Sequence, residues 1–576
     1  MEEKILTGYA SIDKPWMKYY KESWIDKPLP QKTLYQMVYD ENKNHQSDYV
    51  FNYFGNRITY RKFFWNIDNV AKSLLRLSVK PDDIVTIMGL SAPETFYCAY
   101  ACSKIGAVIN LISVLAGEQE LINYLNEAKS TVFIALDLYN DKIIKAIPHT
   151  SVKTVINMSL AESMPLHIKA AYMLKTKINK YCNIMNWKDF IALSEGQSKV
   201  KVYKYKPNRF SFLAHTGGTT GEPKGVMLCD DTLNGIVEEY DYISNAAGRR
   251  YGDKYLNGIV PFVLYGFLIN AHVPLSLGME NVLVPKVDVH KIAYILLKYK
   301  VNFVSVVPPY LAEIPHNNRF VTSDLSFIRV LGAGGDGMTQ ELEDKLNSIL
   351  EKQGAPLSLM NGYGLTEVSA TACGNFCKHL FKGSVGFPLN RNVISIFDQY
   401  TNHELVYNEV GEICINTPYI MLGYFNNPEA TSDVVIEHDD GKKWFHTGDI
   451  GYISEEGVIY ITGRIKRIIL TKKDGMVSKI FPDRVEKIID SNISVNVSCV
   501  VQQDTNSAEV KLTAYIVLKE IIQSDNNIIE QELRKVCEAE LPDYSRPDKY
   551  VFIDKMPLTA AGKIDYRALE RMAEEK

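Results

Sequence analysis

Short apolar runs alternate along the chain with longer stretches whose apolar residues recur at helical spacing. Ile84–Leu90 is an apolar run of strand length, and Ala92–Gly106 begins with an Ala-Pro-Glu helix start. Ala107–Leu111 is again strand-like, and a helical stretch at Glu118–Ala128 precedes the apolar run Thr131–Leu136. Strands that alternate with helices are typical of a parallel sheet with helices on both faces, so the pattern predicts an α/β fold.

A second α/β half follows, and in it a predicted strand ends in a glycine-rich turn. Phe327–Leu331 is the strand, Gly332–Gly337 is the turn, and Thr339–Lys352 is the helix that comes next. Ligands favour this edge of a parallel sheet, which makes the turn a candidate binding element. The other elements predicted for this half are strands Asn257–Pro261, Asn281–Pro285 and Val301–Val306, the apolar stretch Phe262–Leu277 and helix Val289–Tyr299.

The last third of the chain has a different pattern. From Gly383 onward it is rich in strand-type alternation, with predicted strands at Val393–Phe397, Glu412–Asn416 and Val458–Thr462. A smaller, charged module follows and runs to the end of the sequence. We therefore expect a large first domain that ends in a β-rich part, and a smaller second domain.

Two segments stand outside this alternation. Residues 1–50 are aromatic and lysine-rich, and we expect their rings to pack onto a domain surface. These rings belong to Trp16, Tyr19, Tyr20 and Trp24. Residues 162–201 carry methionine, leucine and alanine at near-helical spacing among many lysines, a pattern that favours an amphipathic surface helix over a membrane anchor.

The composition is that of an ordinary globular protein. Its 576 residues are too many for one hydrophobic core, so two or more domains are expected. A hydrophobic share of 46%, a charged share of 23% and a formal net charge of −4 exclude a disordered chain. The same charge balance gives no electrostatic case for nucleic-acid binding.

The cysteines and the hydropathy pattern bear on location. The close cysteine pairs, Cys98/Cys102 and Cys373/Cys377, lack metal-ligand spacing beside histidines, which favours a reduced interior. No window is long and uncharged enough for a transmembrane segment, and Met1–Ala10 has no apolar core like that of a signal peptide. We therefore expect a cytoplasmic protein.

The strongest chemical signal is Ser211–Val226, where an apolar strand becomes a glycine- and threonine-rich loop and ends in a lysine. Glycines let backbone N–H groups turn inward, threonines add hydroxyl donors and a lysine adds positive charge, so the loop suits a polyphosphate. It lacks the Gly-Lys-Ser/Thr ending of a Walker loop, and the alternative is a flexible surface loop. The candidate residues are Thr216, Gly217, Gly218, Thr219, Thr220, Gly221 and Lys224.

A second candidate element is Asn361–Glu367, which follows another predicted strand. It offers a planar ring at Tyr363, a hydroxyl at Thr366 and a carboxylate at Glu367 within one turn. A ring, a hydroxyl and a carboxylate suit a nucleotide and its magnesium ion.

Three charged residues further on complete the candidate chemistry. Asp449 lies in a His-Thr-Gly-Asp sequence, Arg464 in a Thr-Gly-Arg sequence, and Lys563 in a Gly-Lys loop of small residues. Each taken alone is more typical of a turn acid, a surface cation or a solvated lysine. Their occurrence after the two upstream loops favours a functional role instead.

Taken together, these stretches resemble the adenylate-forming superfamily of AMP-dependent synthetases and ligases. This superfamily includes acyl-CoA synthetases, peptide-synthetase adenylation domains and firefly luciferases. The glycine loop, Asn361–Glu367, Thr447–Asp449, Gly463–Lys466 and Pro557–Lys563 occur in the family's order. The resemblance covers nearly all of the chain.

The resemblance implies a fold and a reaction. Residues 1–465 would form an N-terminal domain of helix-covered, mostly parallel sheets with a β-rich subdomain. Residues 466–576 would form a smaller, mobile α+β domain with the family hinge at Lys466. A carboxylate would attack the α-phosphate of ATP to give acyl-adenylate and pyrophosphate, and a thiol would take the acyl group after the small domain has swung.

The resemblance also implies a nucleotide site. The leaving phosphates would lie in the glycine loop, and adenine would stack on Tyr363 and bond Asn361. The ribose hydroxyls would bond Asp449 with Arg464 beside it. Gly334, from the second glycine turn, completes the predicted nucleotide-binding set.

The implied catalytic set is Thr366, Glu367 and Lys563. Thr366 would serve the α-phosphate, Glu367 would hold Mg²⁺, and Lys563 would reach in from the C-terminal domain to bridge carboxylate and phosphate. This chemistry is largely positioning and charge neutralisation, so hydrogen-bond donors and one metal should suffice.

Some positions depart from the family pattern. Pro261–His272 contains no acid that could pair with a substrate ammonium, which disfavours an α-amino acid. Leu264-Tyr265 stands where many acyl-CoA synthetases carry a histidine assigned to gating. Lys472–Pro482 is slightly longer than the family's glycine loop, which lines the path of the thiol in relatives.

The favoured hypothesis is a ligase that uses ATP and Mg²⁺ to activate a fatty or aryl acid and passes it to CoA or to a carrier protein's phosphopantetheine thiol. Two alternatives stay open: an amino-acid-type enzyme that loads only a carrier protein, and an inactive nucleotide-binding scaffold. Retention of Glu367, Asp449, Arg464 and Lys563 argues against the scaffold. The expected partners are therefore a small carboxylic acid and CoA or an acyl carrier protein, with no nucleic acid.

Overall fold

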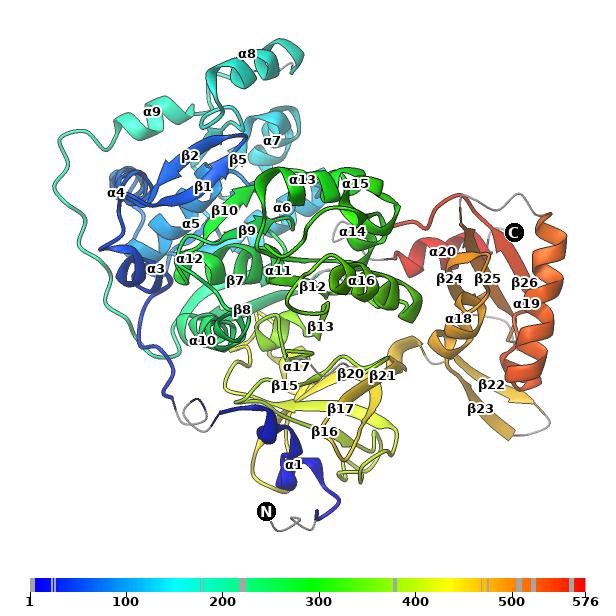
Figure 1. Cartoon of the computed structure of the whole chain (residues 1–576). Coiled ribbons are helices and arrows are strands. Elements are labelled where there is room, and N and C mark those ends of the chain that lie inside the picture. The colour runs from blue at the N-terminus through cyan, green and yellow to red at the C-terminus, as the bar shows by residue number, and fades with distance from the viewer. Residues whose placement is uncertain are drawn as a thin grey trace.

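The chain folds into a large helix-covered body, a β-rich part below it and a C-terminal part at one side (Figure 1). The sheets of the large body are mostly parallel, which confirms the predicted α/β fold class. The computed structural model describes residues 6–21, 24, 27–176, 178–179, 181–216, 224–376, 381–467, 469–473, 476–503, 510–519, 525–558 and 564–574.

The β-α-β units predicted from Ile84 onward form the first sheet. β3 (Ile84–Met88) pairs in parallel with two neighbouring strands, and α5 (Pro93–Ile105) ends at Gly106, whose φ of 81° is in the left-handed region that favours glycine. The order is β18 (Gly423–Tyr424), β8 (Gly225–Cys229), β7 (Phe210–His215), β4 (Val108–Leu111), β3, β5 (Val132–Leu136) and β6 (Thr154–Met158). The helices of this half include α3 (Leu34–Asn42), α4 (Tyr60–Arg76), α6 (Glu118–Glu127), α7 (Asn140–Ala146) and α10 (Asp230–Ala246).

The second half forms a sheet that is parallel at its centre. Its order is β15 (Phe387–Pro388), β14 (Cys373–Gly374), β13 (Met360–Tyr363), β12 (Val330–Gly334), β11 (Phe303–Val306), β9 (Lys254–Asn257), β10 (Glu280–Leu283), β1 (Tyr49–Tyr53) and β2 (Asn56–Thr59). Its helices include α13 (Ile292–Tyr299), α14 (Pro308–Ala312), α15 (Asn318–Val321) and α16 (Gln340–Lys352). Thr339 caps α16 by accepting a hydrogen bond from the backbone N–H of Leu342.

Several boundaries differ from the sequence prediction. β9 ends at Asn257, where a strand was predicted to begin, and β12 runs on through Gly334 into the predicted glycine turn. Gly332 and Gly334 of that turn adopt extended backbone and pair with β13. Pairing with the neighbouring parallel strand therefore extends β12 beyond its apolar run. The stretch 162–201 forms two short helices, α8 (Leu166–Lys175) and α9 (Trp187–Ala192), instead of one.

The apolar stretch 262–277 is helical from Leu264 to Ser276. It consists of α11 (Leu264–Phe267), a π-helical turn at Leu268–His272 and α12 (Val273–Ser276). Almost all of these residues are buried against the main core. An apolar run with no polar face is typical of a helix enclosed on every side.

A β-rich part carries the rest of the N-terminal body. Its strands are antiparallel: β16 (Val393–Phe397), β17 (Gly411–Asn416), β20 (Lys443–Ile453), β19 (Val435–Glu437) and β21 (Ile459–Arg464). Helix α17 (Pro428–Ser432) precedes β19.

The N-terminal aromatic rings pack onto this body, as predicted. Trp16 is fully buried, and Tyr20 donates a hydrogen bond to the carbonyl oxygen of Pro388 at 2.8 Å. The ring centroids of Tyr19 and Phe387 lie 4.6 Å apart. The segment begins with the short helix α1 (Ala10–Asp13) and the 3-10 turn η1 (Pro15–Tyr19).

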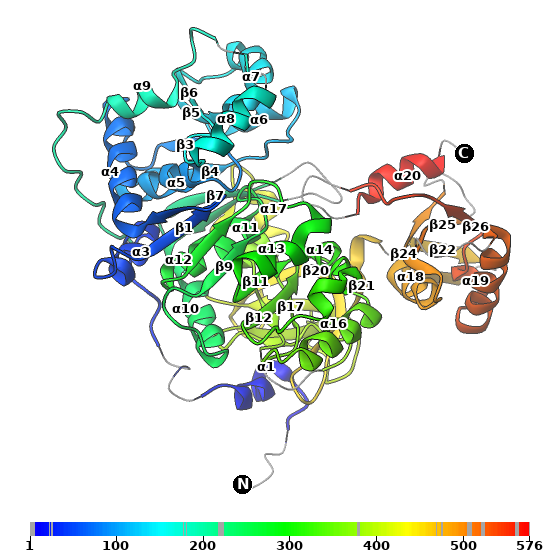
Figure 2. The ribbon, with the colours of Figure 1, turned by 45° about the horizontal axis from the view of Figure 1, so that its top comes forward.

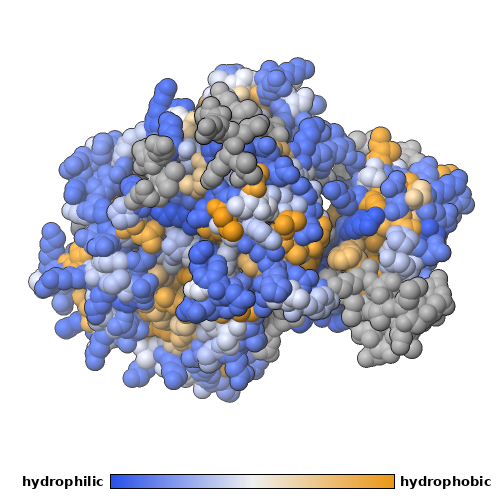
Figure 3. All heavy atoms as spheres, turned by 90° about the horizontal axis from the view of Figure 1, so that it is seen from below, coloured by the Kyte–Doolittle hydropathy of each residue, from blue (hydrophilic) through white to orange (hydrophobic). Residues whose placement is uncertain are grey.

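The C-terminal part has hydrophobic cores of its own. One lies between α18 (Pro482–Asp490) and α19 (Asn526–Glu540), and a second lies under α20 (Tyr566–Glu574). Figure 2 shows this part beside the large body, and Figure 3 shows a hollow between the two. Its strands are β22 (Ile469–Lys473), β23 (Met476–Ile480), β24 (Val495–Gln502), β25 (Leu512–Leu518) and β26 (Lys549–Phe552).

Candidate active site

The candidate site begins where β12 and β13 end. Gly334 closes β12 opposite Gly362 of β13, so the two predicted elements lie side by side in the sheet. Gly335 has a φ of 84°, which turns the chain away from the sheet in a conformation that favours glycine. At Gly364 a Cβ atom would lie 1.9 Å from the carbonyl oxygen of Ala370, so only glycine fits there. The tertiary structure therefore joins the two candidate loops at one sheet edge.

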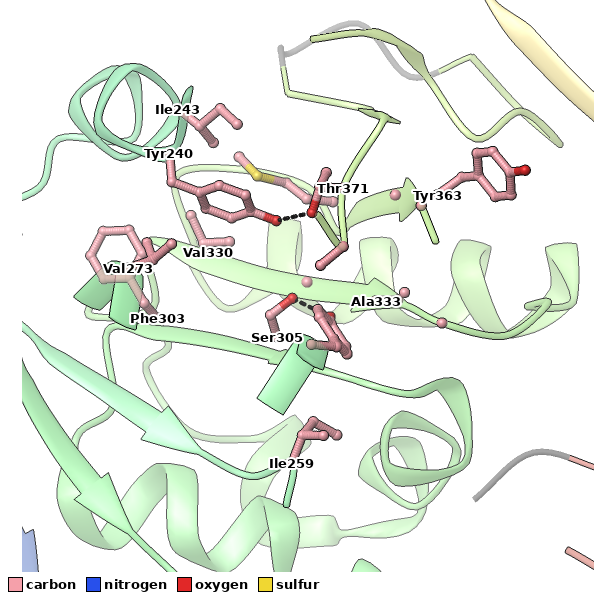
Figure 4. A pocket seen from close by; sticks show the side chains of 18 of the residues that line it. Tyr240, Ile243, Ile259, Val273, Phe303, Ser305, Val330, Ala333, Tyr363 and Thr371 are labelled. Carbon is pink, nitrogen blue, oxygen red and sulfur yellow. Dashed lines mark hydrogen bonds between the residues drawn. The ribbon is translucent and has the colours of Figure 1, made fainter. Parts of the chain in front are cut away.

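An apolar pocket opens beside this edge (Figure 4). Its lining includes Asn361, Tyr363 and Thr366, which the sequence assigned to the nucleotide and the α-phosphate. Figure 4 shows Tyr363 on one side of the pocket and apolar side chains from other elements on the opposite side. The residues of this apolar end include Ile243, Val273, Leu277, Met279, Phe303 and Val330.

The polar groups of the pocket wall are largely paired with one another. Tyr240 and Thr371 share a hydrogen bond of 3.1 Å between their hydroxyls, and Tyr265 and Ser305 share one of 2.6 Å. No carboxylate occurs among the described residues that line the pocket. The wall therefore offers an apolar surface and no described anionic partner for a buried ammonium group.

Asp449 and Arg464 form a group with Tyr363, one of the residues that line the pocket. Asp449 lies opposite Arg464 in the β20–β21 pair, and its Oδ1 is 2.8 Å from Nε of Arg464. The hydroxyl of Tyr363 donates to Oδ2 of the same carboxylate at 2.5 Å. Asp449 is only 2% exposed, so both contacts are largely shielded from water.

The charges of this group act on one another. The Asp449 carboxylate raises the pKa of the Arg464 guanidinium, which keeps that cation charged. Burial and the same carboxylate raise the pKa of Tyr363 well above its usual value, so its hydroxyl stays protonated and able to donate. The three residues therefore form a preorganised group of donors and one acceptor.

A second group links Glu367 to Lys224. The hydroxyl of Tyr424 donates to Oε1 of Glu367 at 2.8 Å, and Nζ of Lys224 lies 4.6 Å from the centroid of the Tyr424 ring. Burial and the Glu367 carboxylate raise the pKa of Tyr424, so this hydroxyl remains a donor. No sequence signal marks Tyr424, because β18 has only two residues and Tyr424 lies 57 positions from Glu367.

The backbone after Glu367 is strained. Ser369 and Ala370 have φ values of 58° and 77°, which side-chain-bearing residues seldom adopt. The hydroxyl of Ser369 donates to the carbonyl oxygen of Tyr419 at 2.9 Å, and the N–H of Met421 donates to the carbonyl oxygen of Glu367 at 2.8 Å. These two hydrogen bonds offset the conformational energy of the strained turn and fix the backbone at Glu367.

Glu412 supports the turn that presents Asp449, another contact that the sequence did not indicate. One carboxylate oxygen accepts from the backbone N–H of Gly448 at 2.9 Å, and the other lies 2.9 Å from Nδ1 of His446. Gly448 has a φ of 71°, so the turn requires glycine. The sequence predicts a strand at Glu412–Asn416, but it does not show that this strand pairs with β20, which brings Glu412 to the turn.

The remaining predicted residues are placed in part. Thr216 and Lys224 lie at the two ends of the glycine loop, where the Thr216 N–H donates to the Lys224 carbonyl at 3.0 Å and the Lys224 N–H to the Thr216 hydroxyl at 3.1 Å. Asn361 donates a long bond of 3.4 Å to the carbonyl of Ser384. Outside the described residues lie Gly217, Gly218, Thr219, Thr220, Gly221 and Lys563.

Comparison with known proteins places the chain in a family. A family model described as AMP-binding enzyme matches residues 39–425, and one described as AMP-binding enzyme C-terminal domain matches residues 484–563. The chain belongs to the AMP-binding enzyme family. This confirms the resemblance drawn from the motifs, while the roles of the individual site residues stay predictions.

Relatives of this AMP-binding enzyme match along most of their length. The long-chain-fatty-acid–CoA ligase of Bacillus subtilis is 28% identical over 571 residues, which cover 96% of this chain and 97% of that protein. A 4-coumarate–CoA ligase of Narcissus pseudonarcissus is 31% identical over 401 residues, covering 68% of this chain and 70% of the relative.

Solved structures share the fold. ATP-bound MatB from Rhodopseudomonas palustris superposes with a TM-score of 0.79 at 20% identity and covers 94% of this chain and 99% of that one. The anthranilate CoA ligase AuaEII in complex with anthranoyl-AMP has a TM-score of 0.78 at 19% identity, with 96% and 99% covered.

Tyr424→Phe tests the link to Glu367. We expect adenylate formation to slow about tenfold, because a hydrogen bond to a charged group stabilises by about 1.5–3 kcal/mol and water replaces part of it. Because Glu367 is predicted to hold Mg²⁺, the Mg²⁺ concentration for half-maximal rate should rise as well when this carboxylate loses its orienting donor. The measurement is ATP–pyrophosphate exchange against Mg²⁺ concentration.

Tyr407→Phe is the matched control. Its hydroxyl donates to Oδ2 of Asp13 at 3.0 Å, a bond of the same type outside the candidate site. If both variants lost the same activity, or if Tyr424→Phe kept the wild-type Mg²⁺ dependence, Tyr424 would not position Glu367.

Proposed function

We propose that this AMP-binding enzyme is an ATP-dependent acid–CoA ligase that activates an apolar, unsubstituted carboxylic acid. The observation that carries the proposal is a pocket whose lining joins Asn361, Tyr363 and Thr366 to a wall of apolar side chains. A carboxylate held at the mouth, with its hydrocarbon in the pocket, would lie beside the residues assigned to ATP. CoA ligases among the relatives support the acceptor.

In the first half-reaction the substrate carboxylate oxygen attacks the α-phosphorus of ATP. A P–O bond forms to the acyl group, the bond to pyrophosphate breaks, and acyl-adenylate results. Tyr363 and Asp449 would hold the adenosine, while Thr216 and Lys224, at the ends of the glycine loop, would face the leaving phosphates. Donors fixed before the reaction stabilise charge without having to reorganise.

The donor set also fits a magnesium ion. Glu367 is a partly exposed carboxylate, and hard oxygen ligands of this kind are those that Mg²⁺ prefers. In the described contacts Tyr424 donates to Oε1 of Glu367, which leaves Oε2 to bind the ion. When bound, the ion would neutralise phosphate charge, and Glu367 would hold it.

In the second half-reaction the sulfur of CoA attacks the acyl carbonyl carbon. A C–S bond forms, the C–O bond to AMP breaks, and the thiol proton passes to solvent. We propose that residues 466–576 rotate about Lys466 between the two steps. The separate hydrophobic cores of the C-terminal part support a unit that can move without unfolding.

The pocket favours an aliphatic acid over a hydroxylated aromatic one. Several of its hydroxyls already have partners: Tyr240 pairs with Thr371, Tyr265 pairs with Ser305, and Ser244 donates to the carbonyl oxygen of Asp241 at 3.2 Å. The apolar side chains of the wall offer a phenolic hydroxyl no partner, and a hydroxyl left unpaired among them costs about 1–3 kcal/mol.

The test is a panel of acids in ATP–pyrophosphate exchange, followed by mass spectrometry of the product with CoA and with a holo-carrier protein. Octanoate and palmitate are expected to give a kcat/KM about tenfold or more above that of 4-coumarate. Higher activity with proteinogenic amino acids than with every simple acid would contradict the proposal. Transfer of the acyl group to the holo-carrier but not to CoA would show that the acceptor is a carrier protein and not CoA.

A further inference from the structure

Helix α8 carries an apolar stripe that faces away from the protein. At about 100° per residue, Leu166, Ala170, Met173 and Leu174 fall within an arc of about 100° on one side of the helix. We call these four residues the α8 stripe. Leu166 is 87% exposed, Met173 63% and Leu174 88%, and no residue of α8 is fully buried.

The opposite side of α8 holds the helix on the body. Ile168 and Tyr172 pack against the main hydrophobic core. Asn140 of α7 donates to the carbonyl oxygen of Asn179, just beyond α8, at 2.8 Å. Figure 1 shows α8 at the upper edge of the molecule, away from the C-terminal part and from strands β12 and β13. The stripe is therefore presented by a docked helix and not by a frayed one.

Exposure of this degree is unusual within the chain. Leu166 and Leu174 are the two most exposed large apolar side chains among the residues that the structure describes. Single exposed apolar residues are normal on a protein surface, but several on one face of one helix need a reason.

The charge around the stripe indicates what covers it. Residues 162–206 contain nine lysines against three acidic residues, a net charge of +6, within a chain whose net charge is −4. Lys169 and Lys175 belong to α8 itself, and the only acid near Lys169 in the described ion pairs is Glu162, at 3.9 Å. Asp141, the nearest acid of α7 in this region, already accepts bonds from Asn179 and Tyr181.

We propose that α8 docks this enzyme onto an anionic lipid surface, with the stripe inserted among the acyl chains and the lysines at the headgroups. An apolar face with a lysine at its edge, here Lys169, and more lysines in the flanking segment fits helices that lie in a bilayer interface. Among the described residues no helix is long and apolar enough to cross a bilayer, and α8 has ten residues. The contact is therefore peripheral.

The docking would serve the proposed reaction without depending on it. Apolar acids with long chains partition into bilayers, so a ligase held there would meet a locally concentrated substrate. Lipid binding is measured without any turnover, and its outcome is thus separate from the outcome of the acid panel.

The experiment is flotation of the full chain with phosphatidylcholine vesicles that contain about 30% phosphatidylglycerol. The wild-type chain is expected to float with these vesicles, to bind pure phosphatidylcholine several-fold less, and to be released by about 0.5 M NaCl. Leu166→Ser combined with Leu174→Ser should lower the partition coefficient about tenfold or more.

The matched control is Ile493→Ser combined with Tyr400→Ser, which removes side chains that are 80% and 74% exposed elsewhere. This control should bind like the wild type, and all three proteins should show equal turnover of a short, water-soluble acid. Failure of the wild type to float, or equal binding of the α8 variant, would overturn the proposal. It would also be overturned if the α8 changes converted a lipid-free dimer into a monomer, because a second copy would then cover the stripe.

Discussion

Lys563→Ala is expected to slow adenylate formation about 10²–10³-fold while leaving thioester formation from supplied acyl-adenylate close to the wild-type rate. The first step brings an anionic carboxylate onto an anionic phosphate. A cation placed between them stabilises charge that exists only in that transition state, so its loss lowers kcat rather than the affinity for ATP. In the second step the small domain would have turned and carried Lys563 away from the carbonyl.

The two half-reactions have to be measured separately on the same variant. Pyrophosphate exchange reports the first, and transfer from synthetic acyl-adenylate to CoA reports the second. Lys555→Ala is the control, because Lys555 is an exposed lysine eight positions upstream in the same part of the chain. Equal loss of both activities in a folded variant would mean that Lys563 is structural or that the rotation does not occur, whereas no loss would leave it a solvated lysine.

Asp449→Ala is expected to raise the KM for ATP by about 10- to 100-fold and to change the KM for the acid much less. A carboxylate that accepts from ribose hydroxyls contributes about 1.5–3 kcal/mol per charged hydrogen bond, partly offset by water. The structure adds a second cause. Without Asp449, the Arg464 guanidinium and the Tyr363 hydroxyl lose the acceptor that orients them.

Two further variants separate these causes. Asp449→Asn keeps the shape of the side chain but removes its charge. Compared with Asp449→Ala, it should restore the hydrogen bond that orients Tyr363 but only part of the affinity for ATP. Asp433→Ala removes an exposed acid outside this group and should match the wild type. An unchanged KM for ATP in Asp449→Ala, with the variant still folded by circular dichroism, would remove Asp449 from the nucleotide site.

The α/β fold was predictable because its signals are local. The run Ile84–Leu90 and the helix after it follow from spacing between near neighbours, and the structure has β3 and α5 there. Strand ends were less predictable, as β9 and β12 show, because a strand ends where its neighbour stops pairing and not where its own apolar run stops. For the same reason the lysine-rich segment 162–201 gave no indication of its break into α8 and α9.

Part of the candidate site could also be predicted, since motifs in a fixed order identified the family. They named Tyr363, Asp449 and Arg464, and the structure brings these three into contact. The motifs did not name the residues that orient them, because such residues have no fixed composition. Tyr424 reaches Glu367 across 57 positions, and Glu412 reaches the turn before Asp449 across 36.

The sequence by itself thus determined the fold class, the family and the residues predicted to meet the nucleotide. Only the tertiary structure decided which strands pair, and with that pairing the Glu367–Tyr424 contact, the hydroxyl pairs of the pocket wall and the apolar side chains of that wall. The physical reason is the sequence separation over which each kind of interaction acts. Periodicity and capping act between residues a few positions apart, whereas a pocket is made by side chains from distant segments whose proximity depends on the packing of the whole chain.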